Sequence, residues 1–110
     1  MNDPIAKHFV KTYLERVRQH YAPCEFWLWG SRIYGQPRYD SDLDCVIVSE
    51  KFQHTKKIKR GFEFITAIQK FKDRTGFSLN PFCFTPAEFA ERKLNPWMMQ
   101  DLFAKGLRLI

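Results

Sequence analysis

Two short apolar segments with a turn directly after the first limit what this chain can fold into. Residues 25–29 (EFWLW) are too short and too aromatic for a helix, and residues 42–48 (DLDCVIV) begin acidic and end in a continuous apolar run. Both patterns are typical of buried strands. Gly30 and Ser31 close the first segment, and a loop with glycine and proline precedes the second. The sequence therefore predicts two strands joined by a loop, with a short turn of helix at residues 31–34.

Segments with helical periodicity surround these strands. Asp3 and Pro4 suit the N-cap and the first position of a helix, and apolar residues then recur every four positions, which predicts an amphipathic helix over residues 4–20. A second helix is predicted from Ile58 to a stop at Gly76. The residues expected on its buried face are Ile58, Phe62, Ile65, Ile68 and Phe71.

The last third of the chain predicts a third strand and two further helices. Residues 77–84 (FSLNPFCF) have a strand pattern in which Pro81 lacks an N–H donor and favours a sheet edge or a bulge. Residues 85–88 (TPAE) have the capping-box spacing of a helix start. The last helix is expected to start at residues 95–96 and to end at Gly106, with a short terminal strand after it. This order indicates an α/β (α+β) domain with a small sheet flanked by helices.

Length and composition indicate one packed domain. With 110 residues, 45% of them hydrophobic, the chain is expected to form a single domain over residues 1–110. It has no apolar window of membrane-spanning length and no signal-peptide pattern, so we expect a cytoplasmic protein outside the membrane. Cys24, Cys45 and Cys83 share no metal-binding spacing and are expected to be free, buried thiols.

The turn and the start of the second strand carry the residues with chemical function. Gly30 has no Cβ, so a phosphate can approach the backbone N–H groups of the turn, and the Ser31 hydroxyl can donate to it. Asp42 and Asp44 are two positions apart, which places both carboxylates on one face of a strand. Two carboxylates opposite a phosphate-binding turn are the arrangement needed to hold Mg²⁺ against a nucleoside triphosphate.

The segment WLWGSRIYGQPRYDSDLDCVIV, residues 27–48, resembles the signature of the DNA polymerase β nucleotidyltransferase superfamily, and the short chain resembles its minimal nucleotidyltransferase branch. The shared pattern is a hydrophobic strand followed by G-S-R-x-x-G and S-D-x-D. Later elements, including T-P-x-E-F at residues 85–89, keep the family's order over about residues 1–110. The resemblance implies a mixed sheet, a bound nucleoside triphosphate with Mg²⁺ or Mn²⁺, and transfer of a nucleoside monophosphate to a hydroxyl group.

The resemblance also implies roles for individual residues and a class of partner. The implied nucleotide-binding residues are Gly30, Ser31, Arg32 and Ser41. The implied metal ligands are Asp42 and Asp44, and these two together with position 80 are the implied catalytic residues. Members of the branch are often paired, as antitoxins, with a helical HEPN-domain protein. This pairing favours an acceptor hydroxyl on a partner protein.

Asn80 departs from the family pattern. The family usually carries a third carboxylate on the third strand, shortly before the T-P-x-E-F turn, and the matching residue here is Asn80. An amide cannot act as a general base and is a poorer, uncharged metal ligand. Asp40 offers a replacement if the second strand extends backwards, and a role in a turn is the alternative. The chain is therefore expected to be a slow transferase or a catalytically impaired nucleotide-binding module.

The net charge of +6 favours anionic partners. Five cations follow the second strand: Lys51, Lys56, Lys57, Lys59 and Arg60. This basic segment is either a solvated face or a surface for RNA or for an acidic partner. An RNA- or protein-binding module with the same fold is therefore the alternative to an enzyme.

Overall fold

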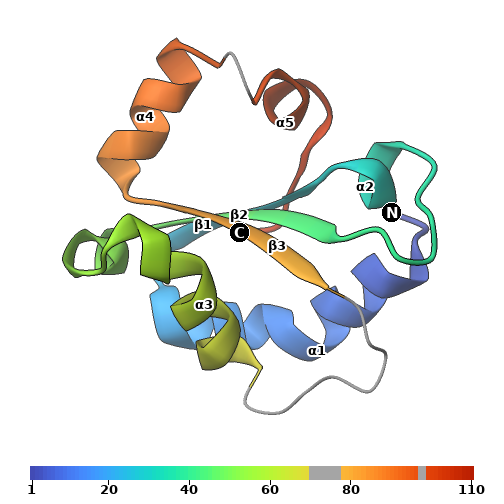
Figure 1. The fold of residues 1–110 in the computed structure, drawn as a ribbon, viewed down its shortest axis with the longest axis horizontal. Helices are drawn as coiled ribbons and strands as arrows, with labels where there is room; N and C mark the ends of the chain where they lie inside the picture. The colour runs from blue at the N-terminus through green and yellow to red at the C-terminus, as the bar shows by residue number, and fades with distance from the viewer. Residues whose placement is uncertain (70–77, 97–98) are drawn as a thin grey trace.

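The computed structural model describes residues 1–69, 78–96 and 99–110, and within them a four-stranded sheet lies between two layers of helices (Figure 1). The elements in chain order are α1 (Pro4–Tyr21), β1 (Cys24–Trp29), α2 (Ser31–Tyr34), β2 (Leu43–Ser49), the 3₁₀ helix η1 (Glu50–His54), α3 (Lys57–Ile68), β3 (Leu79–Phe84), α4 (Pro86–Leu94), α5 (Gln100–Lys105) and β4 (Leu107–Arg108). The predicted α/β class, a small sheet flanked by helices, is confirmed. No described helix has both the length and the apolar character to cross a membrane.

The sheet is mixed, as the resemblance implied. Its strand order is β3-β2-β1-β4, with β1 antiparallel to β2 and β4, and β2 parallel to β3. In this register Asp44 lies opposite Trp29 on one neighbouring strand and opposite Asn80 on the other. The strand with Pro81 is at the edge of the sheet, one of the two positions predicted for it. The start of β2 is therefore flanked by the end of β1 and the start of β3.

Side chains point alternately to the two faces of the sheet along each strand, and a hydrophobic core lies on each face. In Figure 1, α1 and α3 lie on one side of the sheet, and α4 and α5 lie on the other. The largest fully buried residues of the first core are Phe9, Phe26, Phe64, Leu28, Leu43, Ile47 and Ile68. The buried residues of the second core are Val46, Val48, Phe89, Met99 and Leu102. Asp44 is two positions before Val46, so its side chain leaves the sheet on the side of α4 and α5.

The predicted starts of α1 and α4 and the predicted free thiols are present. The Asp3 carboxylate caps α1 by accepting from the Ala6 N–H at 2.9 Å. Thr85 and Glu88 form the expected capping box at the start of α4. Cys45 is fully buried, whereas Cys24 and Cys83 are partly buried, and all three are free thiols.

Helix α3 turns a different face to the core from the one predicted. Its buried side chains are those of Arg60, Phe64 and Ile68. Ile58 and Phe62, both expected inside, are 90% and 76% exposed. The expectation for these two residues was therefore wrong. The predicted members Phe71 and Gly76 lie outside the described residues.

The burial of Arg60 explains the orientation of α3. Its Nη1 donates to Glu88 of α4 at 2.6 Å, and its Nε donates to the Thr55 carbonyl oxygen at 3.1 Å. The guanidinium carbon also lies 5.9 Å from the centre of the Phe52 ring. Hydrophobic periodicity treats arginine as outward-facing, so it selects the wrong stripe when an arginine is paired inside.

Two connections also differ from the sequence prediction. Helix η1 was not predicted, and its Phe52 is buried against Tyr21 with ring centroids 5.1 Å apart. Helix α5 begins later than residues 95–96, because Asn95 forms the C-cap of α4. Gly106 ends α5 as predicted, and β4 follows it.

The Glu88 carboxylate predicts a loss of stability in acid. Partial burial raises its pKa, but hydrogen bonds from the Thr85 backbone, Arg60, Lys57 and the Thr85 side chain outweigh burial and lower the pKa to about 2, below its ordinary 4.5. Because the folded-state pKa is depressed, this stabilisation is present above about pH 4.5 and is lost as the pH falls toward 2. Glu88→Gln keeps the capping box and removes the ion pairs with Arg60 and Lys57. The free energy of unfolding should fall by only about 1 kcal/mol at pH 7, because solvent screens these ion pairs.

Urea unfolding of the wild type and Glu88→Gln at pH 7, 4 and 2.5 measures this contribution. The difference between the two proteins should shrink as the pH falls. Glu91→Gln, which neutralises an exposed carboxylate one turn further along α4, is the control for net charge. A difference that stays constant with pH would contradict the assignment.

Candidate functional site

The predicted turn and the Asp44 carboxylate meet where β1 ends and β2 begins. Gly30 follows β1 directly and is the N-cap of α2, the short helix predicted at residues 31–34. Its φ of 84° and ψ of −168° are rarely adopted by a residue with a side chain. A Cβ atom at this position would also collide with Asp44 Oδ2. Two independent constraints therefore require glycine here, and the second places its backbone against the Asp44 carboxylate.

Asp44 shares this edge of the sheet with Asn80 and Asp42. Asn80 Nδ2 donates to Asp44 Oδ1 at 3.0 Å across the parallel pair of β2 and β3. Burial raises the pKa of Asp44, the bond from Asn80 lowers it, and the negative charge of Asp42 raises it, with a net increase. The raised pKa means that the ionised form of Asp44 is energetically disfavoured here, and a nearby cation would stabilise it.

The chemistry of these side chains suits a divalent cation that also takes ligands from a bound molecule. Asp42 and Asp44 offer carboxylate oxygens, which Mg²⁺ and Mn²⁺ prefer. Among residues 1–69, 78–96 and 99–110, no cluster of three or more Asp, Glu, His or Cys side chains is arranged to hold a metal. A cation here would need further oxygen ligands, and the phosphates of a nucleotide supply such oxygens.

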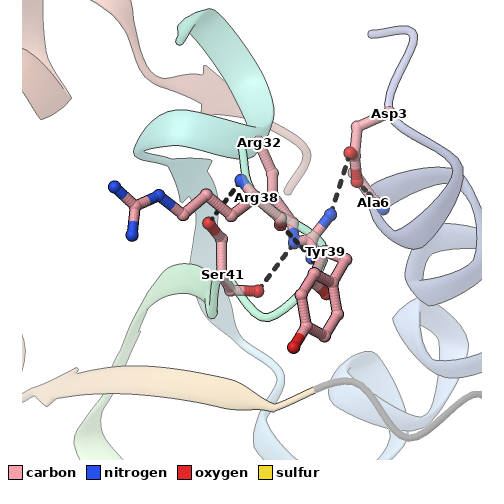
Figure 2. A network of polar contacts seen from close by, with 6 residues as sticks. All are labelled: Asp3, Ala6, Arg32, Arg38, Tyr39 and Ser41. Atoms are coloured by element: carbon pink, nitrogen blue, oxygen red, sulfur yellow. Dashed lines mark hydrogen bonds and ion pairs between the residues drawn. The ribbon is translucent and has the colours of Figure 1, made fainter. Parts of the chain in front are cut away.

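The other three candidates for nucleotide binding occupy different environments. Ser31 is the first residue of α2 and is partly exposed. The Ser41 hydroxyl accepts from the Arg38 N–H at 2.8 Å, so it shapes the turn at the end of the loop. Arg32 was expected at a phosphate, but its guanidinium is buried and donates to acceptors within the protein (Figure 2). Its side chain therefore supports the loop.

The comparison with known protein families agrees with this geometry. The family model described as a nucleotidyltransferase domain matches residues 10–81, a range that includes Gly30, Asp42, Asp44 and Asn80. The chain belongs to the nucleotidyltransferase domain family. This membership confirms the resemblance to minimal nucleotidyltransferases of the polymerase β superfamily and supports transfer of a nucleoside monophosphate as the general activity. No curated protein and no solved structure gives a significant match.

The structure adds Tyr34 to the surroundings of the candidate site. Burial raises the pKa of Tyr34, the Gly30 backbone lowers it by hydrogen bonding, and the Asp101 and Asp44 carboxylates raise it. The Gly30 backbone and the Asp44 carboxylate thus both act on the titration of Tyr34. Lys105 Nζ is 5.5 Å from the centre of the Tyr34 ring, which brings a cation from α5 to this region. Tyr34 is four residues after Gly30, about one helical turn, so this spacing could have indicated that the two residues are close. The position of Lys105 depends on tertiary packing.

In the basic segment of this nucleotidyltransferase domain the four lysines are exposed and Arg60 is buried. Arg60 is buried and paired, and Lys51 Nζ donates to the His20 carbonyl oxygen at 2.7 Å. Lys57 Nζ lies 3.3 Å from a carboxylate oxygen of α4. The exposed lysines are compatible with a solvated face, and the RNA-binding surface stays a prediction.

The replacement Gly30→Ala should impair both folding and nucleotide binding. The positive φ alone costs about 1–3 kcal/mol for a residue with a side chain, and the added methyl group displaces the Asp44 carboxylate. Thermal melting and calorimetric titration with ATP and Mg²⁺ measure the two losses. Gly61→Ala is the matched control. Gly61 lies within helix α3, and a Cβ atom there would make an ordinary 3.5 Å contact with Pro81. Unchanged melting and affinity in Gly30→Ala would contradict the geometry of the turn.

Proposed function

We propose that this protein is a metal-dependent nucleotidyltransferase that transfers a nucleoside monophosphate from a triphosphate to a hydroxyl group of a partner protein. The observation that carries the proposal is the close approach of the Gly30 backbone to the Asp44 carboxylate, with the charge of Asp42 acting on Asp44. The proximity of the turn to the two carboxylates supports their proposed joint action on a metal-bound triphosphate. Membership of the nucleotidyltransferase domain family supports the reaction class.

The Gly30–Ser31 turn and the two aspartates have different proposed roles in binding. Gly30 leaves the backbone open to phosphate oxygens, and the Ser31 hydroxyl donates to them. Asp42 and Asp44 are the proposed ligands of Mg²⁺ or Mn²⁺. When bound, the cation supplies neutralisation of the charge that develops on the phosphate oxygens. Phosphoryl transfer depends chiefly on positioning and charge neutralisation, so these residues account for most of the catalysis proposed here.

Within residues 1–69, 78–96 and 99–110, no third carboxylate is grouped with Asp42 and Asp44 to take the proton of the acceptor hydroxyl. Asn80, which we place among the catalytic residues by its position, donates to Asp44 and cannot take a proton. Asp40 is exposed in the turn formed by residues 38–41, where the Ser41 N–H donates to the Arg38 carbonyl oxygen. It is not part of β2, so the turn role is favoured for Asp40. We therefore expect transfer to be slow unless a partner contributes a base.

The proposed partner follows from the family resemblance. A HEPN-domain protein in the same cytoplasm would supply the acceptor hydroxyl and receive the nucleotide as an antitoxin modification. The Asn80 amide specifically favours a second candidate function, a nucleotide-binding module without transfer, because it occupies the position of the third carboxylate. The two functions share nucleotide binding and differ in whether a covalent product forms.

Calorimetric titration with ATP tests the binding that both functions require. We expect saturable binding with Mg²⁺ or Mn²⁺ and a large loss of affinity when a chelator is present. The Asp42→Ala/Asp44→Ala variant should stay folded, because Asp42 is exposed and Asp44 is only partly buried, and it should show no metal dependence. Equal affinity with and without the chelator in the wild type would refute the proposed site.

A further inference from the structure

Arg32 is a buried cation in the first turn after Gly30, and its guanidinium is fully engaged with the protein. Its side chain is only 6% exposed. Nε donates to the Ser41 carbonyl oxygen at 2.9 Å, and Nη2 donates to those of Arg38 and Tyr39 at 3.2 and 3.1 Å. Nη1 donates to Asp3 Oδ1 at 3.0 Å. All three guanidinium nitrogens thus have acceptors within the chain, as Figure 2 shows.

These bonds converge on the turn that immediately precedes Asp42. Within this turn the Ser41 N–H donates to the Arg38 carbonyl oxygen at 3.1 Å, and the Ser41 hydroxyl accepts from the Arg38 N–H. All residues from Tyr34 to Asp40 are exposed, so their side chains provide little burial to hold the loop. Arg32 is therefore the main buried link between this loop and the rest of the domain.

Asp3 anchors the other end of this link. Its carboxylate is 8% exposed and is shared between two donors, Arg32 Nη1 and the Ala6 N–H that begins α1. An 18-residue helix packed on the first core is a firm support for this contact. The buried pair of Arg32 and Asp3 thus connects the N-terminus of α1 to the loop that carries Asp42. In Figure 1 the N-terminus lies beside α2, in agreement with this connection.

We propose that Arg32 is a positioning residue, which fixes the turn before Asp42 so that Asp42 stays close to Asp44 and the Gly30–Ser31 turn. This inference rests on the proposed function, because it explains how the carboxylate pair is prepared for a cation and a triphosphate. A planar fork with five N–H donors can bridge three carbonyl groups and a carboxylate, whereas a lysine ammonium cannot span them. The positioning role therefore requires the planar shape of the arginine side chain, because a positive charge alone would not hold these acceptors together.

Two variants separate this role from a direct phosphate contact. Arg32→Ala removes the fork and the charge, and Arg32→Lys keeps the charge and removes the fork. Asp3→Asn retains a good helix N-cap and removes only the negative partner, so it gives a milder variant if the Arg32 replacements fold poorly. Arg18→Ala, which removes an exposed arginine of α1, is the matched control.

The experiment combines calorimetric titration with Mn²⁺–ATP and amide hydrogen exchange of the segment 36–43. Arg32→Ala and Arg32→Lys should both bind at least tenfold more weakly and exchange faster in this segment, while α3 exchanges as in the wild type. Asp3→Asn should bind a few-fold more weakly, and Arg18→Ala should match the wild type.

Each contrary result has a separate meaning. Wild-type affinity and exchange in Arg32→Ala would overturn the positioning role. Full affinity in Arg32→Lys with a loosened loop would assign Arg32 to phosphate binding and also overturn it. If the wild type binds no Mn²⁺–ATP, the proposed function fails, and unchanged exchange in Arg32→Ala would then refute the loop-fixing role independently.

Discussion

Replacing Asn80 with aspartate should raise the rate of nucleotidyl transfer by about 10²–10⁴-fold, the range that a positioned proton acceptor contributes. Asn80 Nδ2 is 3.0 Å from Asp44 Oδ1, so the new carboxylate would lie within reach of any cation held by Asp44. It would supply both an oxygen ligand and a base near the site where the acceptor hydroxyl attacks. The measurement is the single-turnover rate of label transfer from an α-labelled triphosphate.

The same replacement should change metal binding in a defined direction. The Asn80 bond that lowers the Asp44 pKa would be replaced by a like charge, so the pKa of Asp44 should rise further in the absence of a cation. A divalent cation would remove this repulsion, and Mn²⁺ affinity should therefore increase. Asn80→Gln, which keeps an amide, is the control and should not gain activity. An unchanged rate in a folded Asn80→Asp variant would locate the proton acceptor elsewhere.

The replacement Asp44→Asn should lower metal-dependent nucleotide binding and transfer by at least about a hundredfold, since even supporting residues of metal sites contribute ten- to a hundredfold. Stability should move in the opposite direction. The folded-state pKa of Asp44 is raised, mainly by burial, so its ionised form destabilises the fold at neutral pH. The neutral, nearly isosteric amide should therefore melt at the same temperature or higher.

Melting and titration of Asp44→Asn together distinguish a functional from a structural role. Trp27, on the neighbouring strand and the same face of the sheet, offers a structural comparison, and Trp27→Phe should lower stability with little effect on nucleotide affinity. A lower melting temperature in Asp44→Asn with intact nucleotide affinity would assign Asp44 to folding and contradict the proposed site.

Local patterns predicted the strands and the turn at the site. The aromatic segment before Gly30 and the apolar run after Asp44 each have one favoured structure, and the helix caps at Asp3 and Thr85 depend on neighbouring residues only. The family resemblance grouped Asn80 with Asp42 and Asp44, and the parallel register of β2 and β3 places Asn80 directly opposite Asp44. The strands, the turn and the helix caps depend on periodicity and on short-range spacing.

The missed features depend on buried arginines and on contacts between distant segments. Arg60 and Arg32 are charged residues that are buried because acceptors from other segments surround them. Periodicity assigns Arg60 to the surface, which misplaced Ile58 and Phe62 of α3. The family resemblance implied a phosphate contact for Arg32 and gave no sign of its burial. Sequence patterns do not indicate which carbonyl oxygens the fold brings close to a guanidinium group.

The most direct test of the central claim is the incubation of the protein with an α-labelled nucleoside triphosphate and Mg²⁺, with and without a candidate HEPN-domain partner. A nucleotidyltransferase transfers the label covalently to the partner and releases pyrophosphate, and Asp44→Asn does neither. Mass spectrometry of the partner should show the added nucleoside monophosphate on a hydroxyl group. Saturable, Mg²⁺-dependent nucleotide binding with no covalent product, even for Asn80→Asp with the partner present, would contradict the transferase and identify a nucleotide-binding module.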